Sequence, residues 1–338
     1  MIGVVGASAR AAVMSLARAG HSAWAVDLFN DRDLKRIAPC ARCSLADFPQ
    51  AIPALAEQFP PGPVLYTGGL ENYPEVIAEL AQKRQLLGNG PDVLKRVRDP
   101  FALPLPRPEM LAAGETVPAT GAWVVKSLRS SGGLGVRLAK PGEIVSPGHY
   151  LQEFIDGPAM SAVFRDRELI GVTEQLVGTP WLHAKAFHYA GTIASRAGSV
   201  SDGTLDRRLR FRLLGWFGID FILNDGTPYV IEVNPRYPAS LEAIEHANHL
   251  DRVVGKAIYF APRSFRFPPT GPWDADLEGS FDPWRLPNFA DIPEPGELME
   301  AGSPVLTFFA SGTTAEECRQ GLQSRATELD HLFAGTHT

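Results

Sequence analysis

The sequence predicts an α/β protein that opens with a parallel sheet and continues into mixed, hairpin-rich structure. An apolar run at residues 2–5, an Ala-rich stretch at 11–19 and a second apolar run at 24–27 follow one another in the pattern of a β-α-β unit. Later in the chain, two apolar runs are joined by Asn224-Asp225-Gly226-Thr227, in which Asp-Gly favours a tight hairpin turn. The chain has 338 residues, which is enough for two or three domains.

Composition narrows the class of protein. Hydrophobic residues make up 45% of the chain and the formal net charge is −6, so a packed core is expected and a disordered chain is excluded. We see no apolar run of the roughly 18 residues that would cross a bilayer, no secretion signal and no block of Lys and Arg dense enough for nucleic acid. We therefore expect a cytoplasmic protein that acts on small molecules, with neither nucleic acid nor membrane as partner.

The three cysteines do not point to a disulfide scaffold. Cys40 and Cys43 form a C-x-x-C pair in an expected loop after Pro39, and Cys318 stands alone. A structural zinc would need two further ligands, and no second pair supplies them. The sequence leaves open whether Cys40 and Cys43 have a role.

The next elements complete the first part of the chain. Residues 64–67 are expected to form a strand that ends in Gly68-Gly69, and residues 75–85 a helix. A short basic helix at 92–98 is stopped by Asp99-Pro100.

A lysine precedes a glycine-rich hairpin in the middle of the chain. Residues 122–126 and 135–138 are expected strands, and Lys126 ends the first of them. The intervening Ser130-Ser131-Gly132-Gly133-Leu134-Gly135 would let backbone N–H groups close over phosphates, to which the lysine adds a positive charge. A plain hairpin turn is the alternative. Another strand is expected at residues 150–154.

A helical pattern at residues 206–217 leads into two paired strands that carry acidic groups. Residues 219–223 hold Asp220, and residues 229–233 hold Glu232 just before Asn234. Because side chains alternate along a strand, these polar groups share one face. Hard oxygen ligands of this kind suit Mg²⁺, and the nearby Arg236 could stabilise charge that develops during phosphoryl transfer. Solvated carboxylates on an open sheet face are the alternative.

The remainder of the chain is less regular. Residues 240–259 have a long helical pattern, and nine prolines between Pro262 and Pro304 predict loops and short strands. A strand at 305–310 and an amphipathic helix at 314–333 close the sequence.

The lysine–glycine hairpin, the strand Leu151-Gln152-Glu153-Phe154-Ile155 and the paired strands ending in Glu232-Val233-Asn234-Pro235-Arg236, in this order, resemble the ATP-grasp superfamily. The resemblance implies the three-domain layout of biotin-carboxylase-like members. It would consist of a Rossmann-like pre-ATP-grasp domain at 1–92, a two-lobed α+β ATP-grasp clamp at 93–255 and a small C-terminal domain at 256–338. The lobes of the clamp would be residues 93–155 and 156–255.

The resemblance also implies roles for individual residues. ATP would be bound by Lys126 at the phosphates, by a lid loop and by an inter-lobe hinge, with Lys126 and Arg236 acting in the chemistry. The lid would comprise Ser130, Ser131, Gly132, Gly133 and Gly135, and the hinge Gln152, Glu153, Phe154 and Ile155. Asp220, Glu232 and Asn234 would hold Mg²⁺ (or Mn²⁺). Substrate contacts would come from Ser8, Arg10, Glu71, Tyr189, Gly191, Ser240 and Glu242.

The implied activity is that of an ATP-dependent, ADP-forming ligase. Such an enzyme converts a carboxylate to an acyl phosphate, which an amine then attacks to give an amide. The opening G-A-S-x-R-A and the stretch after the second strand resemble uncharacterised ATP-grasp proteins linked to tetrahydromethanopterin- or methanofuran-type cofactor synthesis, so an amino acid or cofactor precursor is the expected substrate. A bicarbonate-dependent carboxylase and a non-catalytic ATP-binding module are the alternatives, and a homodimer is left open.

One position departs from the superfamily pattern. A lysine usually stands at the start of the first lobe and contacts the nucleotide phosphates, but this chain has Arg98-Asp99-Pro100 there. Arg98 and Lys95 are the candidates to replace it.

Overall fold

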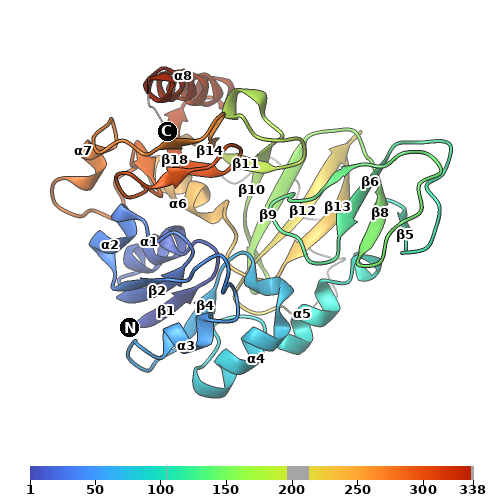
Figure 1. Cartoon of the computed structure of the whole chain (residues 1–338), viewed down its shortest axis with the longest axis horizontal. Coiled ribbons are helices and arrows are strands. Elements are labelled where there is room, and N and C mark those ends of the chain that lie inside the picture. Colours follow the sequence, from blue (N-terminus) through green and yellow to red (C-terminus); the bar gives the residue numbers. More distant parts are fainter. Residues whose placement is uncertain (105, 196–212, 336–338) are drawn as a thin grey trace.

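The computed structural model describes residues 1–104, 106–195 and 213–335. Its N-terminal part is a four-stranded parallel sheet in the order β3-β2-β1-β4 (Figure 1). The strands are β1 (Ile2–Val5), β2 (Ala23–Asp27), β3 (Cys40–Arg42) and β4 (Val64–Tyr66). The predicted β-α-β opening is therefore correct. Cys40 begins a strand on the edge of this sheet, so the loop expected there is wrong.

Helices surround this sheet and lead into the next part of the chain. They are α1 (Arg10–Arg18), α2 (Arg32–Ile37), α3 (Ile52–Ala56) and α4 (Pro74–Lys83). The short turns η1 (Leu70–Asn72) and η2 (Pro100–Ala102) flank α4 and α5 (Pro91–Val97). The helix α5 stops before Pro100, as predicted, because a residue that precedes proline is disfavoured in the helical conformation.

The predicted glycine-rich hairpin belongs to a small antiparallel sheet with the order β5-β8-β6-β7. Its strands are β5 (Met110–Leu111), β6 (Trp123–Ser127), β7 (Arg137–Leu138) and β8 (His149–Glu153). Val124 pairs with Leu138 and Val125 with Arg137, so the loop between β6 and β7 turns back on itself at the end of the lysine-bearing strand.

An eight-stranded sheet forms the centre of the molecule, in the order β13-β12-β9-β10-β11-β14-β18-β16. Its members are β9 (Ala159–Arg165), β10 (Glu168–Val177), β11 (Tyr189–Ala194), β12 (Trp216–Asn224), β13 (Thr227–Asn234), β14 (Val253–Phe260), β16 (Phe289–Ala290) and β18 (Pro304–Gly312). The predicted hairpin around Asp225 joins β12 and β13. The domain boundary expected after residue 255 falls inside β14. The domain boundaries stay predictions.

Two expected helices need comment. The pattern at 240–259 is a helix only in its first half, because α6 (Leu241–Leu250) ends at Asp251, whose φ of 53° is left-handed, and β14 then begins. The β-branched and aromatic residues that follow favour a strand, which the helical spacing concealed. Residues 206–212 of the expected 206–217 helix lie outside the described residues, and from Trp216 the chain is already in β12.

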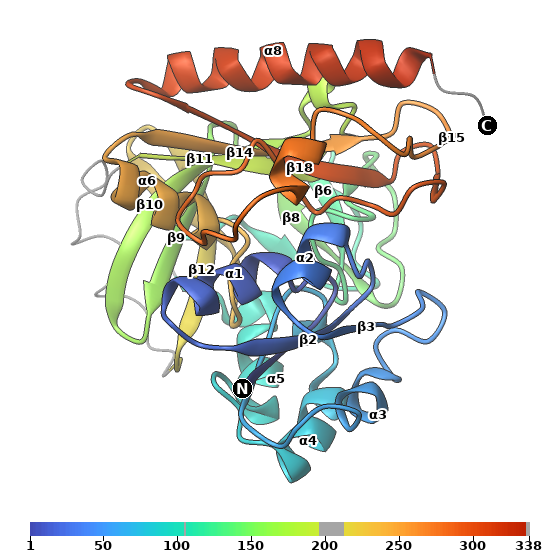
Figure 2. The ribbon, with the colours of Figure 1, turned by 90° about the vertical axis from the view of Figure 1, so that its left-hand side faces the viewer.

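The C-terminal helix α8 (Ala315–Ala334) covers β14 and β18 (Figure 2). It begins as the sequence predicts, because the Thr314 hydroxyl accepts a hydrogen bond from the Glu317 N–H group at 3.1 Å. Smaller elements complete this part of the chain. They are η3 (Pro180–Leu182), α7 (Asp274–Leu277) and the paired strands β15 (Phe265–Arg266) and β17 (Leu298–Met299).

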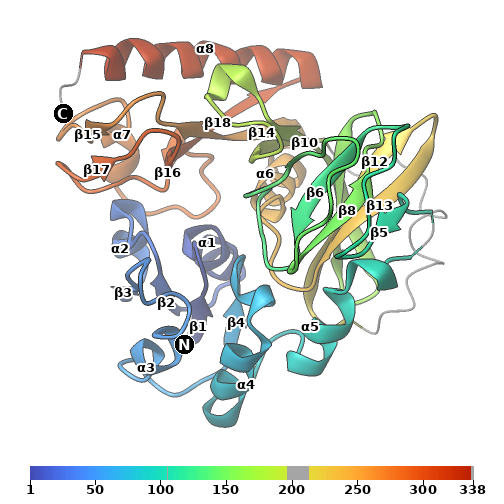
Figure 3. The same ribbon diagram turned by 45° about the vertical axis from the view of Figure 1, so that its right-hand side comes forward.

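The small sheet lies beside the strands β9, β12 and β13 of the large one, and the carboxyl ends of β1 and β4 approach from below (Figure 3). This arrangement brings three separate parts of the chain to one place. Within the described part of the chain, no helix is both long and apolar enough to span a membrane.

Candidate active site

A cavity of about 430 Å³ lies between the two sheets and the strand ends of the N-terminal part. Most of the predicted site residues line it. These are Ser8, Lys126, Ser130, Ser131, Gly132, Gly133, Gln152, Glu153, Phe154, Ile155, Tyr189, Asp220, Glu232, Asn234, Arg236 and Ser240. Residues that are more than 200 positions apart in the sequence therefore share one site.

The glycine-rich loop is held against both walls of the cavity by its backbone. The Ser130 carbonyl accepts hydrogen bonds from Asn72 Nδ2 at 3.2 Å and from Arg98 Nη2 at 3.0 Å. The Gly132 carbonyl accepts one from the Tyr189 N–H group at 3.0 Å. Gly133 has a φ of 79°, and a Cβ added to it would lie 1.8 Å from the Phe187 carbonyl oxygen, so only glycine permits this approach.

Lys126 extends from the end of β6 into the same cavity. Burial lowers its pKa, against the opposing influence of the Glu232 and Asp220 carboxylates. A partly dehydrated ammonium near two acids is suited to bind an anionic ligand that is accompanied by its own cation.

Gln152, on β8, is 2% exposed, and its Nε2 atom has no hydrogen-bond partner among the described residues. A buried amide N–H group without a partner lowers the stability of the protein, and this one faces the cavity, where a ligand can accept a hydrogen bond from it. Ring nitrogens on the edge of a purine accept such a bond. The hinge segment that contains Gln152 thus fits the nucleobase role that the resemblance implies.

Two of the three predicted metal ligands, Asp220 and Glu232, are in register with each other on the paired strands β12 and β13. Asp220 accepts hydrogen bonds from Gln175 Nε2 at 3.1 Å and Asn234 Nδ2 at 2.8 Å. Glu232 Oε1 accepts one from Arg98 Nη1.

The charges of these two carboxylates are strongly coupled. Burial, and then the Glu232 carboxylate, raises the pKa of Asp220 to about 6. Burial would also raise the pKa of Glu232, but the positive charges of Arg98 and Lys126 lower it overall. A cation placed between the two acids would relieve their repulsion.

The donor set fits a hard divalent ion. Two carboxylates and the amide of Asn234 are oxygen donors of the type that Mg²⁺ prefers. Within residues 1–104, 106–195 and 213–335, no cluster of three or more His, Cys, Asp and Glu side chains could hold a metal. The candidate therefore rests on two acids and an amide, a composition typical of sites that share the ion with substrate phosphates.

Arg236 follows Asn234 and is fixed by three contacts. Its Nε atom donates to Glu71 Oε1 at 3.1 Å, its Nη1 atom to the Tyr237 carbonyl at 3.1 Å and its Nη2 atom to Asn234 Oδ1 at 3.2 Å. Glu71 is 0% exposed and reaches Arg236 from η1, so the N-terminal part of the chain orients this guanidinium.

Five predicted site residues do not line the cavity. They are Gly135, Arg10, Glu71, Gly191 and Glu242. Glu71 lies behind Arg236. Arg10 and Glu242 bind each other, with Arg10 Nη1 and Glu242 Oε1 2.6 Å apart, so their charges are satisfied within the protein. Their direct contact with substrate stays a prediction.

Three charged residues that line the cavity, Arg98, Lys256 and Asp291, had a weak sequence signal or none. Of the two candidates to replace the superfamily lysine, Lys95 is exposed on α5, whereas Arg98 points inward and its Nε atom has no partner among the described residues. Lys256 and Asp291 come from β14 and the turn after β16. The residues next to them in the sequence are mostly apolar, so only the folded sheet shows that they line the cavity.

Comparisons with known proteins agree with this geometry. Residues 92–240 match the family model described as the ATP-grasp domain. A search of curated proteins finds no match.

Among solved structures, similarity extends over nearly the whole chain at low identity. N5-carboxyaminoimidazole ribonucleotide synthetase from Thermus thermophilus is 15% identical with a TM-score of 0.62, over 97% of this chain and 98% of that one. L-amino acid ligase from Bacillus licheniformis is 15% identical with a TM-score of 0.60, over 98% of this chain and 97% of that one. Phosphoribosylamine–glycine ligase from Thermotoga maritima is 15% identical with a TM-score of 0.58, over 98% of this chain and 96% of that one. These likenesses show a shared fold.

Proposed function

We propose, from the ATP-grasp domain that residues 92–240 form, that this protein is an ATP- and Mg²⁺-dependent ligase that joins a carboxylate to an amine. The observation that carries the proposal is the cavity itself. Lys126 with its glycine-rich loop, the acid pair Asp220 and Glu232, and Arg236 all open onto the same space. A protein that only binds ATP has no need of a fixed arginine beyond the two acids.

At one end of the cavity the chain would bind the nucleotide. Gln152 offers its unpartnered amide to the base, and Lys126 offers its charge to the phosphates. Arg98 is the cation that takes the place of the superfamily lysine, because it reaches both the glycine-rich loop and Glu232. When the phosphates arrive, the guanidinium can exchange these bonds for bonds to phosphate oxygens.

In the middle of the cavity, Asp220, Glu232 and Asn234 would hold Mg²⁺ or Mn²⁺. Such an ion, when bound, neutralises phosphate charge. Arg98 binds one oxygen of Glu232, and a carboxylate has about four acceptor positions, so Glu232 can bind the ion and keep this bond. The chain thus keeps this acid neutralised in either state.

Arg236 would act on the transferring group. The substrate carboxylate attacks the γ-phosphorus of ATP, ADP leaves, and an acyl phosphate forms. The amine then adds to the acyl carbon and expels inorganic phosphate, leaving an amide. Negative charge spreads over the phosphoryl oxygens in the first step, and a guanidinium already oriented by Glu71 can stabilise it without reorganisation.

One screen tests the proposal. The protein is incubated with Mg·ATP and pools of carboxylates, amines, amino acids and cofactor precursors, and the release of ADP and phosphate is followed. Release that requires two organic substrates supports ligation. Release that requires bicarbonate supports the carboxylase, and tight ATP binding without turnover supports the non-catalytic module. A precursor of a tetrahydromethanopterin- or methanofuran-type cofactor belongs in the pools as the finer prediction.

A further inference from the structure

Two residues of opposite charge line the cavity but have no role in the proposed reaction. Lys256 lies on β14 and Asp291 in the turn after β16, and both line the cavity. In the large sheet, β14 is separated from β12, which carries Asp220, by β9, β10 and β11. At a strand spacing of about 4.8 Å, this places Lys256 well away from the acid pair. The two charges therefore line a part of the cavity away from the acid pair.

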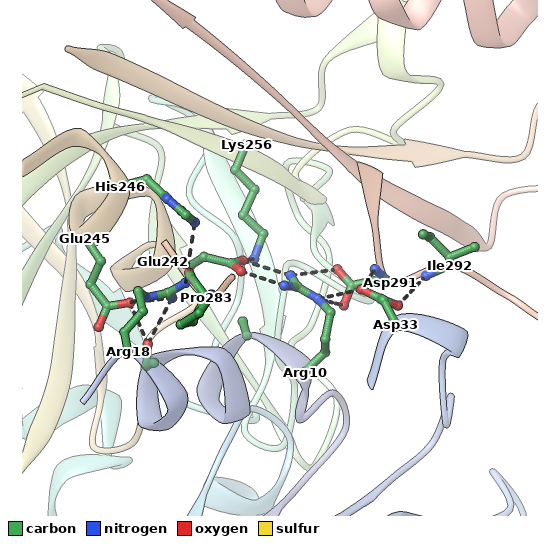
Figure 4. Close-up of polar contacts among 12 residues, drawn as sticks. Arg10, Arg18, Asp33, Glu242, Glu245, His246, Lys256, Pro283, Asp291 and Ile292 are labelled. Carbon is green, nitrogen blue, oxygen red and sulfur yellow. Dashed lines mark hydrogen bonds and ion pairs between the residues drawn. The ribbon is translucent and has the colours of Figure 1, made fainter. Parts of the chain in front are cut away.

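Each of these charges is held in place from behind (Figure 4). Lys256 is 5% exposed, and its Nζ atom donates to Glu242 Oε2 at 2.7 Å. Asp291 accepts from Arg10 Nε at 2.8 Å, and its own N–H group donates to Asp33 Oδ2 at 2.9 Å. An ammonium has three donors and a carboxylate about four acceptor positions, so both groups keep free capacity.

The two charges do not neutralise each other directly. No ion pair within 4.0 Å joins Lys256 to Asp291 among the described residues. Their fields nevertheless overlap, since the positive charges of Arg10 and Lys256 lower the pKa of Asp291 although burial alone would raise it. Asp291 is therefore an anion at neutral pH. A ligand placed between a fixed cation and a fixed anion needs both signs of charge.

Tyr189 adds an independent sign that a ligand is missing here. It lines the cavity from β11, the strand next to β14, and its buried hydroxyl has no partner among the described residues. After burial, the Asp220 carboxylate contributes to raising its pKa, and the Glu242 carboxylate does so as well. The hydroxyl thus lies within the field of Asp220 and of Glu242, the ion-pair partner of Lys256.

We propose that one substrate of the ligase is an α-amino acid, whose carboxylate is bound by Lys256 and whose ammonium group is bound by Asp291, with the Tyr189 hydroxyl as a third contact. The inference rests on the proposed function, whose carboxylate or amine it would specify. A plain carboxylate would leave the free acceptor positions of Asp291 without a donor, and a plain amine would leave the free N–H groups of Lys256 without an acceptor. A zwitterion satisfies both, because its two charged groups stand on one carbon.

Direct binding tests this assignment separately from turnover. Isothermal titration measures the binding of the L- and D-amino acids to the full-length protein, each beside the amine that lacks its carboxylate and the acid that lacks its ammonium group. We expect at least one amino acid to bind about tenfold or more tightly than both of its single-charge counterparts, the effect of one charged hydrogen bond.

Variants then assign the two charges. Asp291→Asn should weaken amino acid binding about tenfold or more, and the variant should no longer prefer the amino acid to the matched acid. Lys256→Met should weaken amino acid binding to a similar extent, and this variant should no longer prefer the amino acid to the matched amine. Lys256→Arg and Asp291→Glu, which keep the charge, should restore much of the affinity. Glu245→Gln is the control, because it removes a similarly placed ion pair (Arg18 Nη2 to Glu245 Oε2, 2.6 Å) that does not line the cavity (Figure 4).

The outcomes separate the two proposals. If the wild-type protein binds no amino acid, or binds the single-charge compounds equally well, this assignment is overturned even where the screen shows ADP release with two other substrates. Amino acid binding with no ADP release would instead support the binding site and count against the ligase. Should a variant fail to fold, by circular dichroism, the wild-type comparison still decides.

Discussion

Arg236, which we propose acts in the chemical step, is held in one orientation by its neighbours. Its three contacts come from a carboxylate, a carbonyl and an amide, and they fix the plane of the guanidinium before any ligand arrives. Its ion-pair partner is Glu71, from the N-terminal part of the chain, and not the nearby Glu242 on α6. A role confined to ordering the entry to α6 is therefore not what the contacts support.

Replacing this guanidinium should affect the chemical step. Arg236→Lys keeps the charge but loses the fixed planar donors, and the loss of one preorganised donor costs roughly 2.7–4 kcal/mol in sites of this kind. We expect kcat to fall by about 10²–10³ while the Kd for ATP changes much less. Steady-state kinetics and titration of ATP on the same sample measure both. Loss of activity in proportion to a lowered Tm would contradict the catalytic role.

A different prediction concerns Arg98, because its partners are the glycine-rich loop and Glu232, a proposed metal ligand. Arg98→Met should raise the Kd for Mg·ATP about tenfold or more, since a charge-assisted bond to phosphate is lost. Lys95→Met, three residues earlier on the exposed face of α5, is the matched control and should leave the Kd unchanged. Equal effects of the two variants, measured by titration, would show that Arg98 does not contact the nucleotide.

At this scale the sequence located much of the site but not all of it. Asp220, Glu232 and Asn234 could be grouped because side chains alternate on paired strands, and Lys126 because it precedes three glycines. Lys256 and Asp291 could not be found in this way. They line one cavity only because the sheet order brings β14 and the turn after β16 to the same side of the molecule, which no local pattern encodes.

At the scale of elements, the glycine-rich loop is the part most sensitive to a single atom. It is exposed, yet Gly132 and Gly133 dock on the backbone at 187–189. Gly135, on the same loop, also has a positive φ, of 75°, but nothing lies within 4 Å of a Cβ added there. The two positions therefore separate backbone strain from docking.

Alanine at each position tests the docking. Gly133→Ala must push the loop away from the Phe187 carbonyl, and a displacement of about 1 Å near reacting groups can cost on the order of 10² in rate. Gly135→Ala carries the conformational strain alone and should lose far less. Comparing kcat/KM for ATP in the two variants checks this. Similar losses in both would mean that strain, and not docking, governs the loop.

The helix α6 carries a buried histidine that should tie stability to pH. Burial lowers the pKa of His246 from its usual value near 6.5 to about 4. Arg18 can only donate to His246 Nε2, at 3.4 Å, so the ring proton is placed on Nδ1, which has no partner among the described residues. The ring is therefore neutral in the folded protein at pH 5 but protonated in the unfolded chain.

Protons thus bind preferentially to the unfolded chain between pH 6.5 and about 4, and stability falls as the pH is lowered through this range. The contribution of His246 is up to about 3 kcal/mol. Urea unfolding of wild-type protein and of His246→Gln at several pH values isolates it, because Asp and Glu residues shift both curves alike. A constant difference between the two curves would rule the effect out.

Element assignment from sequence failed where two patterns overlap. Residues 240–259 have helical spacing throughout, but Asp251 adopts a left-handed conformation and the next strand pairs with β11 and β18. Long-range pairing overrides local propensity at such a point. The hairpins around Gly133 and Asp225, whose turns are encoded locally, were predicted correctly.

At the scale of the whole molecule, a buried ion cluster joins the three parts of the chain. Arg10 on α1 binds Glu242 on α6 and Asp291 in the C-terminal part, and Glu242 also binds Lys256 on β14 (Figure 4). The positive charges of Arg10 and Lys256 hold the pKa of Glu242 well below its usual range, although burial would raise it. The cluster fixes how the N-terminal sheet meets the wall of the cavity.

Removing the central cation should therefore destabilise the entire protein. Arg10→Met leaves Glu242 and Asp291 with fewer partners in a dry setting, and breaking a buried pair in this way costs about 3–5 kcal/mol of unfolding free energy. Lys35→Met, which removes an exposed pair with Glu294 at 2.7 Å, should cost at most about 1 kcal/mol. Urea unfolding measures both, and equal costs would show that the cluster does not hold the parts together.

The central claim is that a carboxylate is activated by phosphorylation in this cavity. The measurement that tests it most directly uses a carboxylate substrate found in the screen, with both of its carboxyl oxygens labelled with ¹⁸O. After turnover with Mg·ATP and the amine, mass spectrometry should find one ¹⁸O in each inorganic phosphate released and none in the nucleotide, because one carboxyl oxygen leaves with the phosphoryl group. Unlabelled phosphate, or label in AMP, would contradict the account.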